Sequence, residues 1–441
     1  MRFVILLSLV GVAGCTHTPP PVEMTHPPVS HRLEQRADAL FSAAARTNDL
    51  SGRLLVREEG RTVFTKSYGF ADFGTRTPHG SPTRYSAASI TKGLTAAAVV
   101  HLVRSGQIDL PRPIAEYLPD LEGATTASVA QVLDHTSGLP RDLPDSFAGG
   151  SVARWVAENR DRLAPVGAER YSNIGYALLA EVVENVSGQS FANFVENQVL
   201  VPQGMKASKI GEGEASDYAH GAKGYTAGPE PSGIVPAPSA PLEMGASGLV
   251  ATAEDLAIWA EGLASGSYPE FFEAEDPLGS VDRGEETFGE YVSVQGSLPG
   301  YFANAISWNS GRNSVVFVGN LFSAPALTMK RDLLALMGEK PLVSRAPRPE
   351  VVEAGEAHSK LEGQYASESF GDIAIEREEY GHFRLRMIGK PDYWSFHLTP
   401  VASGLHWRAF DRVFVSTPDG ISMGRRDSSA GEKLERLPAA K

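Results

Sequence analysis

The chain has 441 residues, a formal net charge of −13 and a single cysteine. Its hydrophobic content of 42% and charged content of 21% are ordinary for a globular protein, and its length allows a large core and two domains. The negative charge argues against a nucleic-acid partner, because phosphates must be neutralised by cations. A GxGxxG motif, a Walker lysine motif and a His/Cys cluster at metal-ligand spacing are all missing from the sequence. We therefore expect no nucleotide or other cofactor and no metal.

The first fifteen residues look like an export signal. Arg2 opens a charged region, and the apolar residues 3–10 are too few to span a bilayer. Small residues then lead to Cys15, an arrangement that resembles the lipobox of bacterial lipoproteins. The resemblance implies a signal peptide over residues 1–14, lipidation of Cys15 and attachment to a membrane. Because Thr16 rather than aspartate follows, it also implies the cell envelope at the periplasmic face of the outer membrane. The alternative is an ordinary signal peptide with an incidental cysteine.

The next segments alternate between tether, helix and hairpin. Five prolines in residues 15–30 predict a semi-rigid tether. Apolar residues at helical spacing predict a helix over residues 31–45. Two short β patterns, residues 53–57 and 62–66, flank a Glu-Gly turn and predict a hairpin.

The following helix, residues 89–103, carries the first candidate for chemistry. Ser89 and Lys92 stand three positions apart, so both side chains fall on one helical face. The helix has almost no polar stripe, which predicts burial. Burial disfavours the charged form of a lysine and makes it a plausible proton acceptor beside a serine nucleophile. The alternative is an N-cap serine with a lysine that reaches solvent.

The remaining elements up to residue 340 indicate an α+β fold. Apolar periods between residues 110 and 211 are helical, and a Gly/Pro/Ala-rich stretch, 229–240, predicts a long loop. Strand and helix patterns then return at 253–263 (helix), 288–294, 302–308 and 315–318 (strands) and 326–337 (helix). We expect residues 31–340 to form one antiparallel sheet built from both ends of the segment, with helices packed on it and an all-helical insert.

The C-terminal part differs in character. Residues 341–358 are rich in proline and glutamate and predict a linker. Residues 359–441 show short alternating runs, among them a probable hairpin of 413–415 and 421–423. These runs predict a small all-β barrel or sandwich.

A second motif, Tyr171-x-Asn173, offers partners for Ser89. A tyrosine near an ammonium has a lowered pKa and can act as a base, and Asn173 can orient Lys92 and a substrate amide. The alternative is a capped loop in which both residues are structural.

Together with the segments 133–140 (Leu-Asp-His-Thr-Ser-Gly-Leu-Pro) and 245–249 (Gly-Ala-Ser-Gly-Leu), these motifs resemble the β-lactamase-related serine hydrolases. The resemblance implies a β-lactamase/transpeptidase-like fold and an acyl-enzyme on Ser89, with Lys92 and Tyr171 as catalytic proton carriers and Asn173 binding substrate. It implies an oxyanion hole from the backbone N–H groups of Ser89 and Ser297. The C-terminal part is similar to the lipocalin-like barrels that are often appended to these enzymes.

The third motif departs from that family. Where the family has Lys-Thr-Gly or His-x-Gly, this chain has Val294-Gln295-Gly296. Gly296 lets substrate approach the strand, and Gln295 is expected to donate a hydrogen bond to it. Val294 supplies no cation for a substrate carboxylate, which disfavours β-lactam and D-Ala-D-Ala substrates and favours ester or amide hydrolysis. A D-Ala-D-Ala carboxypeptidase or weak β-lactamase, and a binding protein without catalysis, are the alternatives.

His135 and Asp142 are two further polar residues whose roles can be predicted. A Ser-His-Asp triad of Ser89, His135 and Asp134 is disfavoured because adjacent residues rarely face each other, so His135 is expected to be structural. Asp142 is expected to add negative charge at the rim of the site. The expected substrate is a small molecule or peptide, and the sequence leaves the oligomeric state open.

Overall fold

The computed structural model describes residues 29–144, 146–147, 149–228, 233–239, 243–273, 278–338, 340–342, 350–378, 382–390, 394–418, 420–425 and 431–438. The expected signal peptide, Cys15 and nearly all of the tether lie outside these residues. In the part of the chain that is described, no helix has both the length and the apolar character needed to cross a membrane.

A six-stranded antiparallel sheet forms the centre of the molecule, in the order β2-β1-β11-β10-β9-β8. Both ends of residues 31–340 contribute to it, as expected. Its strands are β1 (Gly52–Glu58), β2 (Arg61–Tyr68), β8 (Val281–Glu286), β9 (Gly289–Leu298), β10 (Tyr301–Trp308) and β11 (Asn313–Gly319). Strand β8 was not predicted, because four of its six residues are charged and only Val281 is buried.

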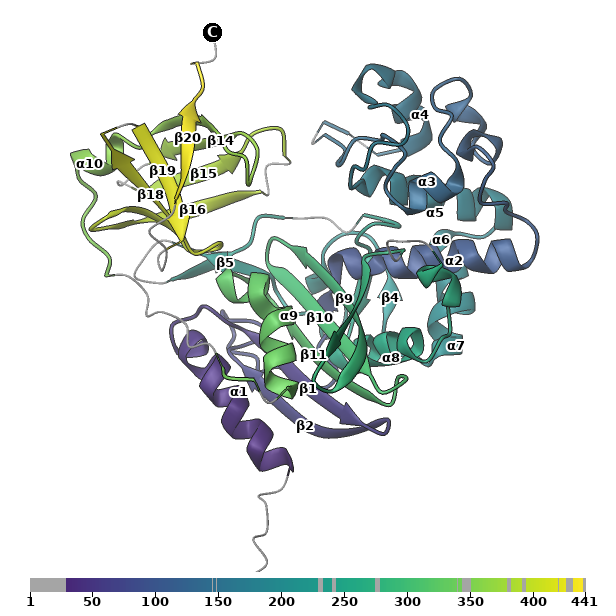
Figure 1. The fold of residues 1–441 in the computed structure, drawn as a ribbon, viewed down its shortest axis with the longest axis horizontal. Helices are drawn as coiled ribbons and strands as arrows, with labels where there is room; N and C mark the ends of the chain where they lie inside the picture. The colour runs from purple at the N-terminus through teal and green to yellow at the C-terminus, as the bar shows by residue number, and fades with distance from the viewer. Residues whose placement is uncertain are drawn as a thin grey trace, which may run out of the picture.

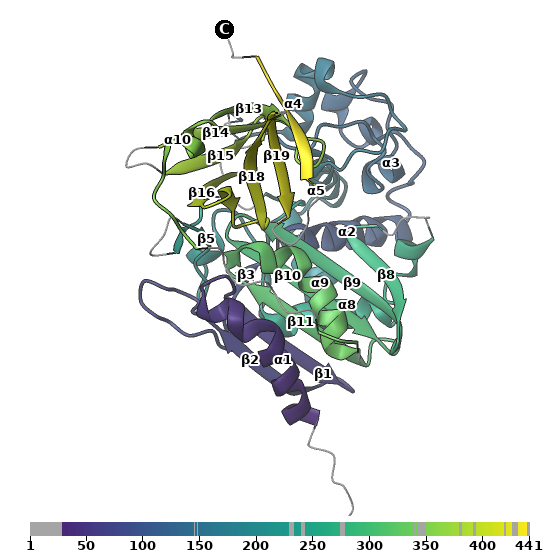
Figure 2. The same ribbon diagram turned by 60° about the vertical axis from the view of Figure 1, so that its left-hand side comes forward.

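Helices cover both faces of this sheet (Figures 1 and 2). On one face lie α1 (Val29–Arg46) and α9 (Ala324–Met337), and on the other lies α8 (Ala253–Ala264). Strand β11 shows why two cores form: Val315 and Phe317 point to the α1 and α9 side, and Val316 and Val318 to the opposite side. The period of two along a strand therefore serves two separate apolar layers.

The helical insert lies beyond the α8 face. It packs around α2 (Thr91–Arg104) and α5 (Asn173–Ser187) and shares their apolar core. Its other helices are α3 (Val129–Leu133), α4 (Val152–Glu158), α6 (Phe191–Val195) and α7 (Val201–Gln203), with a π-helical turn over Glu196–Leu200 and 3-10 turns over Ile114–Glu116, Pro119–Leu121 and Arg160–Arg162.

Short strands connect these layers. They form two small sheets, from β3 (Tyr85–Ser86), β7 (Leu249–Ala251) and β4 (Lys209–Ile210), and from β12 (Leu321–Phe322), β5 (Tyr225–Ala227) and β6 (Ile234–Pro236). Strand β6 lies inside the stretch 229–240, which was expected to be only a loop. Three-residue strands carry too little periodicity to be distinguished from loops by sequence.

The C-terminal part closes into an eight-stranded antiparallel barrel, which confirms the predicted barrel (Figure 1). A short helix, α10 (Glu356–Ser359), precedes it. Its strands are β13 (Gly363–Ala366), β14 (Ile373–Arg377), β15 (Phe383–Met387), β16 (Ser395–Val401), β17 (Gly404–Trp407), β18 (Arg412–Thr417), β19 (Gly420–Arg425) and β20 (Gly431–Arg436).

The barrel is docked on the larger unit through an apolar and an ionic contact. Phe322, from strand β12, is buried in the aromatic cluster of the barrel, where its ring meets that of Phe410. Arg408, which is 4% exposed, pairs with Asp49 and donates to the carbonyl of Thr47. A buried arginine with several partners fixes the relative position of two surfaces, because each unmade bond would leave a desolvated donor.

Candidate active site

Ser89 lies in a 3-10 turn, Ala88–Ile90, that leads directly into α2. Ala88 has φ +48°, a conformation that L-residues rarely adopt and that costs about 1–2 kcal/mol. Ser89 is not the N-cap of α2, since Ile90 holds that place. Its hydroxyl instead bonds two side chains of the site, which rules out the capping alternative.

Lys92 is fully buried one turn further along. Its Nζ donates to Ser89 Oγ at 3.3 Å and to the carbonyl of Ala246 at 3.0 Å. It also lies 4.9 Å from the ring centroid of Tyr171 and 5.6 Å from that of Tyr176. The side chain therefore does not reach solvent, and the carbonyl of Ala246, rather than Asn173 as expected, orients it.

The Gly-Ala-Ser-Gly-Leu segment is held against α2 by two threonines as well. Thr91 Oγ1 accepts from the N–H of Leu249 at 2.9 Å, and Thr95 Oγ1 donates to the carbonyl of Gly245 at 2.7 Å. Gly245 has φ +79°, and a Cβ there would lie 2.3 Å from the carbonyl of Tyr176. These contacts explain why this segment accompanies the Ser-x-x-Lys motif: they fix the carbonyl of Ala246, which accepts a hydrogen bond from Lys92.

Tyr171 brings the second motif to the first, although 82 residues separate it from Ser89. Its hydroxyl is 2.8 Å from Ser89 Oγ. The next residue, Ser172, caps α5 and donates to the carbonyl of Pro140 at 2.6 Å, which fixes the backbone on which Tyr171 stands. Burial raises the pKa of Tyr171, but the ammonium of Lys92 and hydrogen bonds to the phenol outweigh it, so the net shift is downward. This phenol is therefore a better proton acceptor than a free tyrosine.

His135 is a structural residue, as expected. Its Nδ1 accepts the backbone N–H of Ser172 at 3.1 Å, and its ring centroid lies 4.5 Å from that of Tyr171. Burial, together with the charges of Lys92 and Arg141, lowers its pKa to about 4, so the imidazole is neutral at pH 7.

The third motif lies beside Ser89 on the end of strand β9. Strand β8 pairs with β9 only as far as Val294, so residues 295–298 form a free edge. A Cβ on Gly296 would lie 2.3 Å from the carbonyl oxygen of Ala87 and 2.8 Å from the backbone nitrogen of Ser89. Glycine is thus required for the strand to pack against the nucleophile turn, whereas the sequence suggested that it makes room for substrate.

The two residues before Gly296 are not among those that line the cleft. Val294 is 2% exposed and belongs to the apolar core, so its side chain is not among those that line the cleft. Gln295 is exposed and does not line the cleft either. Ser297, which follows Gly296, does line it together with Ser89.

Asn173 is engaged by an acidic partner. Its Nδ2 donates to Asp142 Oδ1 at 2.6 Å. Asp142 Oδ2 pairs with Arg141 Nε at 3.2 Å and lies 3.8 Å from Nζ of Lys390, which belongs to the barrel. Asp142 thus compensates neighbouring cations, and its charge is not left free at the rim.

These groups surround a narrow cleft of about 30 Å³, room for little more than one water molecule. Its lining comes from six separate segments, including the barrel. The lining residues are Ser89, Arg141, Asp142, Tyr171, Asn173, Glu243, Ser247, Ser297, Leu298 and Trp394. Glu243 and Trp394 were missed by sequence reasoning because neither belongs to a motif; each stands next to a loop whose place is set by tertiary packing.

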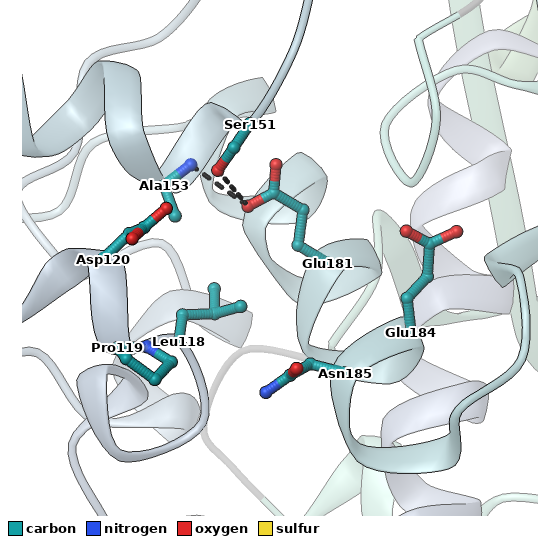
Figure 3. Close-up of a pocket in the computed structure, with 8 residues that line it drawn as sticks. All are labelled: Leu118, Pro119, Asp120, Ser151, Ala153, Glu181, Glu184 and Asn185. Carbon is teal, nitrogen blue, oxygen red and sulfur yellow. Dashed lines mark hydrogen bonds between the residues drawn. The ribbon is translucent and has the colours of Figure 1, made fainter.

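A second and larger cavity, about 510 Å³, lies within the helical insert (Figure 3). Two of its three carboxylates are occupied by helix ends: Glu181 accepts the N–H groups of Val152 and Ala153 at the start of α4, and Glu184 accepts that of Phe191 at the start of α6. The third, Asp120, lies 3.7 Å from the guanidinium of Arg154. Each of these acids thus has a partner within the protein. Among the described residues, no three His, Cys, Asp or Glu side chains are placed to hold a metal ion.

Comparison with known proteins agrees with this geometry. The β-lactamase family model matches residues 37–303, which is more than half of the chain, so the chain belongs to this family of serine hydrolases and penicillin-binding proteins. Penicillin-binding protein 4* of Bacillus subtilis is 28% identical over 189 residues, 39% of this chain and 40% of that protein. Protein flp of Staphylococcus aureus is 25% identical over 243 residues, 51% of this chain and 48% of that protein. The matches thus span less than half the length of these relatives.

Solved structures show the same fold. A class C β-lactamase mutant matches with a TM-score of 0.58 at 19% identity, covering 69% of this chain and 98% of that one. SurE matches with a TM-score of 0.56 at 21% identity, covering 92% and 99%. The octameric penicillin-binding protein homologue from Pyrococcus abyssi matches with a TM-score of 0.57 at 20% identity, covering 92% and 99%. The last two alignments extend over the barrel as well, which confirms the predicted β-lactamase/transpeptidase-like fold with an appended barrel.

Proposed function

We propose that this protein hydrolyses an ester or amide substrate through an acyl-enzyme on Ser89. The observation that carries the proposal is the convergence of Ser89 Oγ with the Tyr171 hydroxyl at 2.8 Å and Lys92 Nζ at 3.3 Å. A serine within hydrogen-bond reach of a base, itself oriented by a third group, is the arrangement of an activated nucleophile.

In the proposed reaction Tyr171 takes the proton of Ser89 as its oxygen attacks the substrate carbonyl. The ammonium of Lys92 stabilises the phenolate that precedes this transfer. The backbone N–H groups of Ser89 and Ser297 bind the developing oxyanion; one such donor contributes about 3–4 kcal/mol to transition-state stabilisation. The leaving group receives the proton from Tyr171, and water then repeats the attack on the acyl-enzyme.

The third motif supports an ester or amide rather than a β-lactam or D-Ala-D-Ala substrate. Among the described residues that line the cleft there is no lysine or histidine, and Val294 is buried in the core. A substrate carboxylate would therefore meet no cation there, and a desolvated charge without a partner is costly.

The test uses a fluorescent fluorophosphonate and a fluorescent penicillin on wild type and Ser89→Ala. Ser89-dependent labelling by the fluorophosphonate alone is the expected result. Labelling by both probes would favour the carboxypeptidase or β-lactamase alternative. The absence of Ser89-dependent labelling by either would favour a binding protein without catalysis.

We further propose that Cys15 is lipidated and holds the protein at the cell envelope, on the periplasmic face of the outer membrane. The support is the apolar segment and the small residues that precede Cys15. Cys15→Ser is expected to release the protein from the membrane fraction; its continued sedimentation with membranes would contradict the proposal.

A further inference from the structure

Glu243 lines the catalytic cleft with its carboxylate unpaired, unlike the other charged groups there. Asp142 is paired with Arg141 and Asn173, and Lys92 donates to two oxygens. Within the described part of the chain, no residue hydrogen-bonds or pairs with the Glu243 carboxylate.

The position of Glu243 is fixed through its backbone. Its N–H donates to Ser247 Oγ at 2.9 Å, and its carbonyl accepts the N–H of Ser247 at 2.9 Å. These two hydrogen bonds tie Glu243 to segment 245–249, whose Ala246 carbonyl accepts a hydrogen bond from Lys92. These bonds fix the backbone of Glu243, and the residue lines the cleft.

The surroundings of this carboxyl make ionisation costly. Burial and, to a lesser extent, the charge of Asp142 raise the pKa of Glu243 to about 7 against the opposing charge of Lys92. A group of this kind gains most from a ligand that brings a positive charge.

The charge on the other wall of the cleft points the same way. Arg141 is the one cation among the cleft-lining residues that are described, and it is occupied by Asp142 and by the ring of Tyr171, 5.0 Å away. Strand β9 presents Val294 to the core and adds none. Among its described lining residues, the cleft thus has an unpaired anion and no unpaired cation to receive a substrate carboxylate.

We propose that Glu243 binds an ammonium group of the substrate, so that this site prefers amine-bearing esters or amides over neutral or carboxylate-bearing ones. The inference rests on the proposed function and names its substrate class. An ammonium supplies the hydrogen bonds and the charge that Glu243 lacks. A neutral acyl group leaves the carboxylate desolvated without a partner, and a carboxylate adds repulsion.

The test compares p-nitrophenyl esters of β-alanine and ε-aminohexanoic acid with their N-acetylated forms, which have the same acyl chain without the charge. Two chain lengths are used because they reach different distances from the carbonyl. For wild type, kcat/KM is expected to be about tenfold to a hundredfold higher for at least one amine than for its acetylated partner, the range given by a charge-assisted hydrogen bond.

The variant is Glu243→Gln, which keeps the shape and removes the charge; Glu122→Gln, on the exposed surface of the insert, is the matched control. The preference is expected to fall close to one in Glu243→Gln and to persist in Glu122→Gln. In wild type the preference is expected to decline as the pH falls through about 7, because Glu243 then binds a proton, while both amines stay charged. Asp142 and Lys92, the charged groups that face Glu243, also act on the ammonium, but they are the same in wild type and Glu243→Gln, so the difference between these two proteins isolates the contribution of Glu243.

The outcomes separate the inference from the proposed function. Ser89-dependent labelling by the fluorophosphonate together with equal turnover of the amine and acetylated esters, or an amine preference that survives in Glu243→Gln, would overturn the inference alone. Absence of both labelling and turnover would overturn the proposed function and the inference with it.

Discussion

The role assigned to Lys92 can be tested by removing its charge and keeping its length, as in Lys92→Met. The ammonium lies 4.9 Å from the ring centroid of Tyr171, and Lys92 is fully buried. At an effective dielectric constant of about 20, two unit charges at this separation interact with about 3 kcal/mol. Loss of that interaction corresponds to a rise of about two units in the pKa of Tyr171.

The assay is the rate at which a fluorophosphonate labels Ser89, measured between about pH 5 and pH 10. In wild type the lowered pKa of Tyr171 makes the phenolate available at lower pH than in a free tyrosine. Without Lys92, burial is no longer opposed, so the pKa rises. The rising limb of the profile is expected to move up by about two pH units, with about a hundredfold lower rate at pH 7.

Arg141→Met is the matched control for this experiment. Its guanidinium lies 5.0 Å from the same ring, but the side chain is 43% exposed and paired with Asp142. Because water screens an exposed charge, the profile is expected to shift by less than about half a unit. Equal shifts for both variants, or an unchanged profile for a Lys92→Met protein with a normal unfolding transition, would refute the electrostatic reasoning.

Three further predictions concern the strand, the barrel and the loop histidine. Gly296→Ala places a methyl group 2.3 Å from the carbonyl of Ala87. It is expected to lower the labelling rate of Ser89 at least tenfold and the free energy of unfolding, measured by urea titration, by about 1–3 kcal/mol. A wild-type labelling rate would contradict the packing argument. Trp394→Ala, which removes a wall of the cleft, is expected to raise KM for p-nitrophenyl esters several-fold when measured below the unfolding transition, and also to lower thermal stability, because the ring packs on Phe322 and Phe396; unchanged KM would show that the barrel does not shape the site. In wild type, the free energy of unfolding is expected to fall by about 3 kcal/mol as the pH drops from 6.5 to about 4, because the lowered pKa of His135 in the folded state makes protonation favour unfolding. His135→Asn is expected to lack this fall; parallel pH curves for both proteins would contradict it.

The sequence predicted the larger elements and the catalytic motifs well, for physical reasons that can be named. The helix at residues 31–45 and the hairpin at 53–57 and 62–66 have strong periodicity and a clear turn, and the structure confirms them as α1, β1 and β2. Ser89 and Lys92 are neighbours on one helical turn, so local geometry brings them together. The contact between Tyr171 and Ser89 could be predicted only from the Tyr-x-Asn motif, because the two residues are far apart in the sequence.

What the sequence did not reveal depends on tertiary packing. Glu243 and Trp394 reach the cleft from loops without periodicity, and their chemistry is visible only when the segments around them are placed. The orientation of Gln295 follows from the packing of Gly296, which the sequence alone does not show. In a strand, alternate residues share a face, so Gly296 packed against Ser89 implies that Gln295 points away.

The same alternation explains why the third motif carries no cation. Val294 and Gly296 lie on the face of β9 that meets the core and the nucleophile turn, and Val294 stands between Val281 and Ala305 on the neighbouring strands. A lysine at that position would have to bring its ammonium through this apolar layer, and desolvation would oppose its charge. The charged residues that line the cleft, Arg141, Asp142 and Glu243, therefore come from loops, whereas strand β9 supplies the close backbone contact with Ser89.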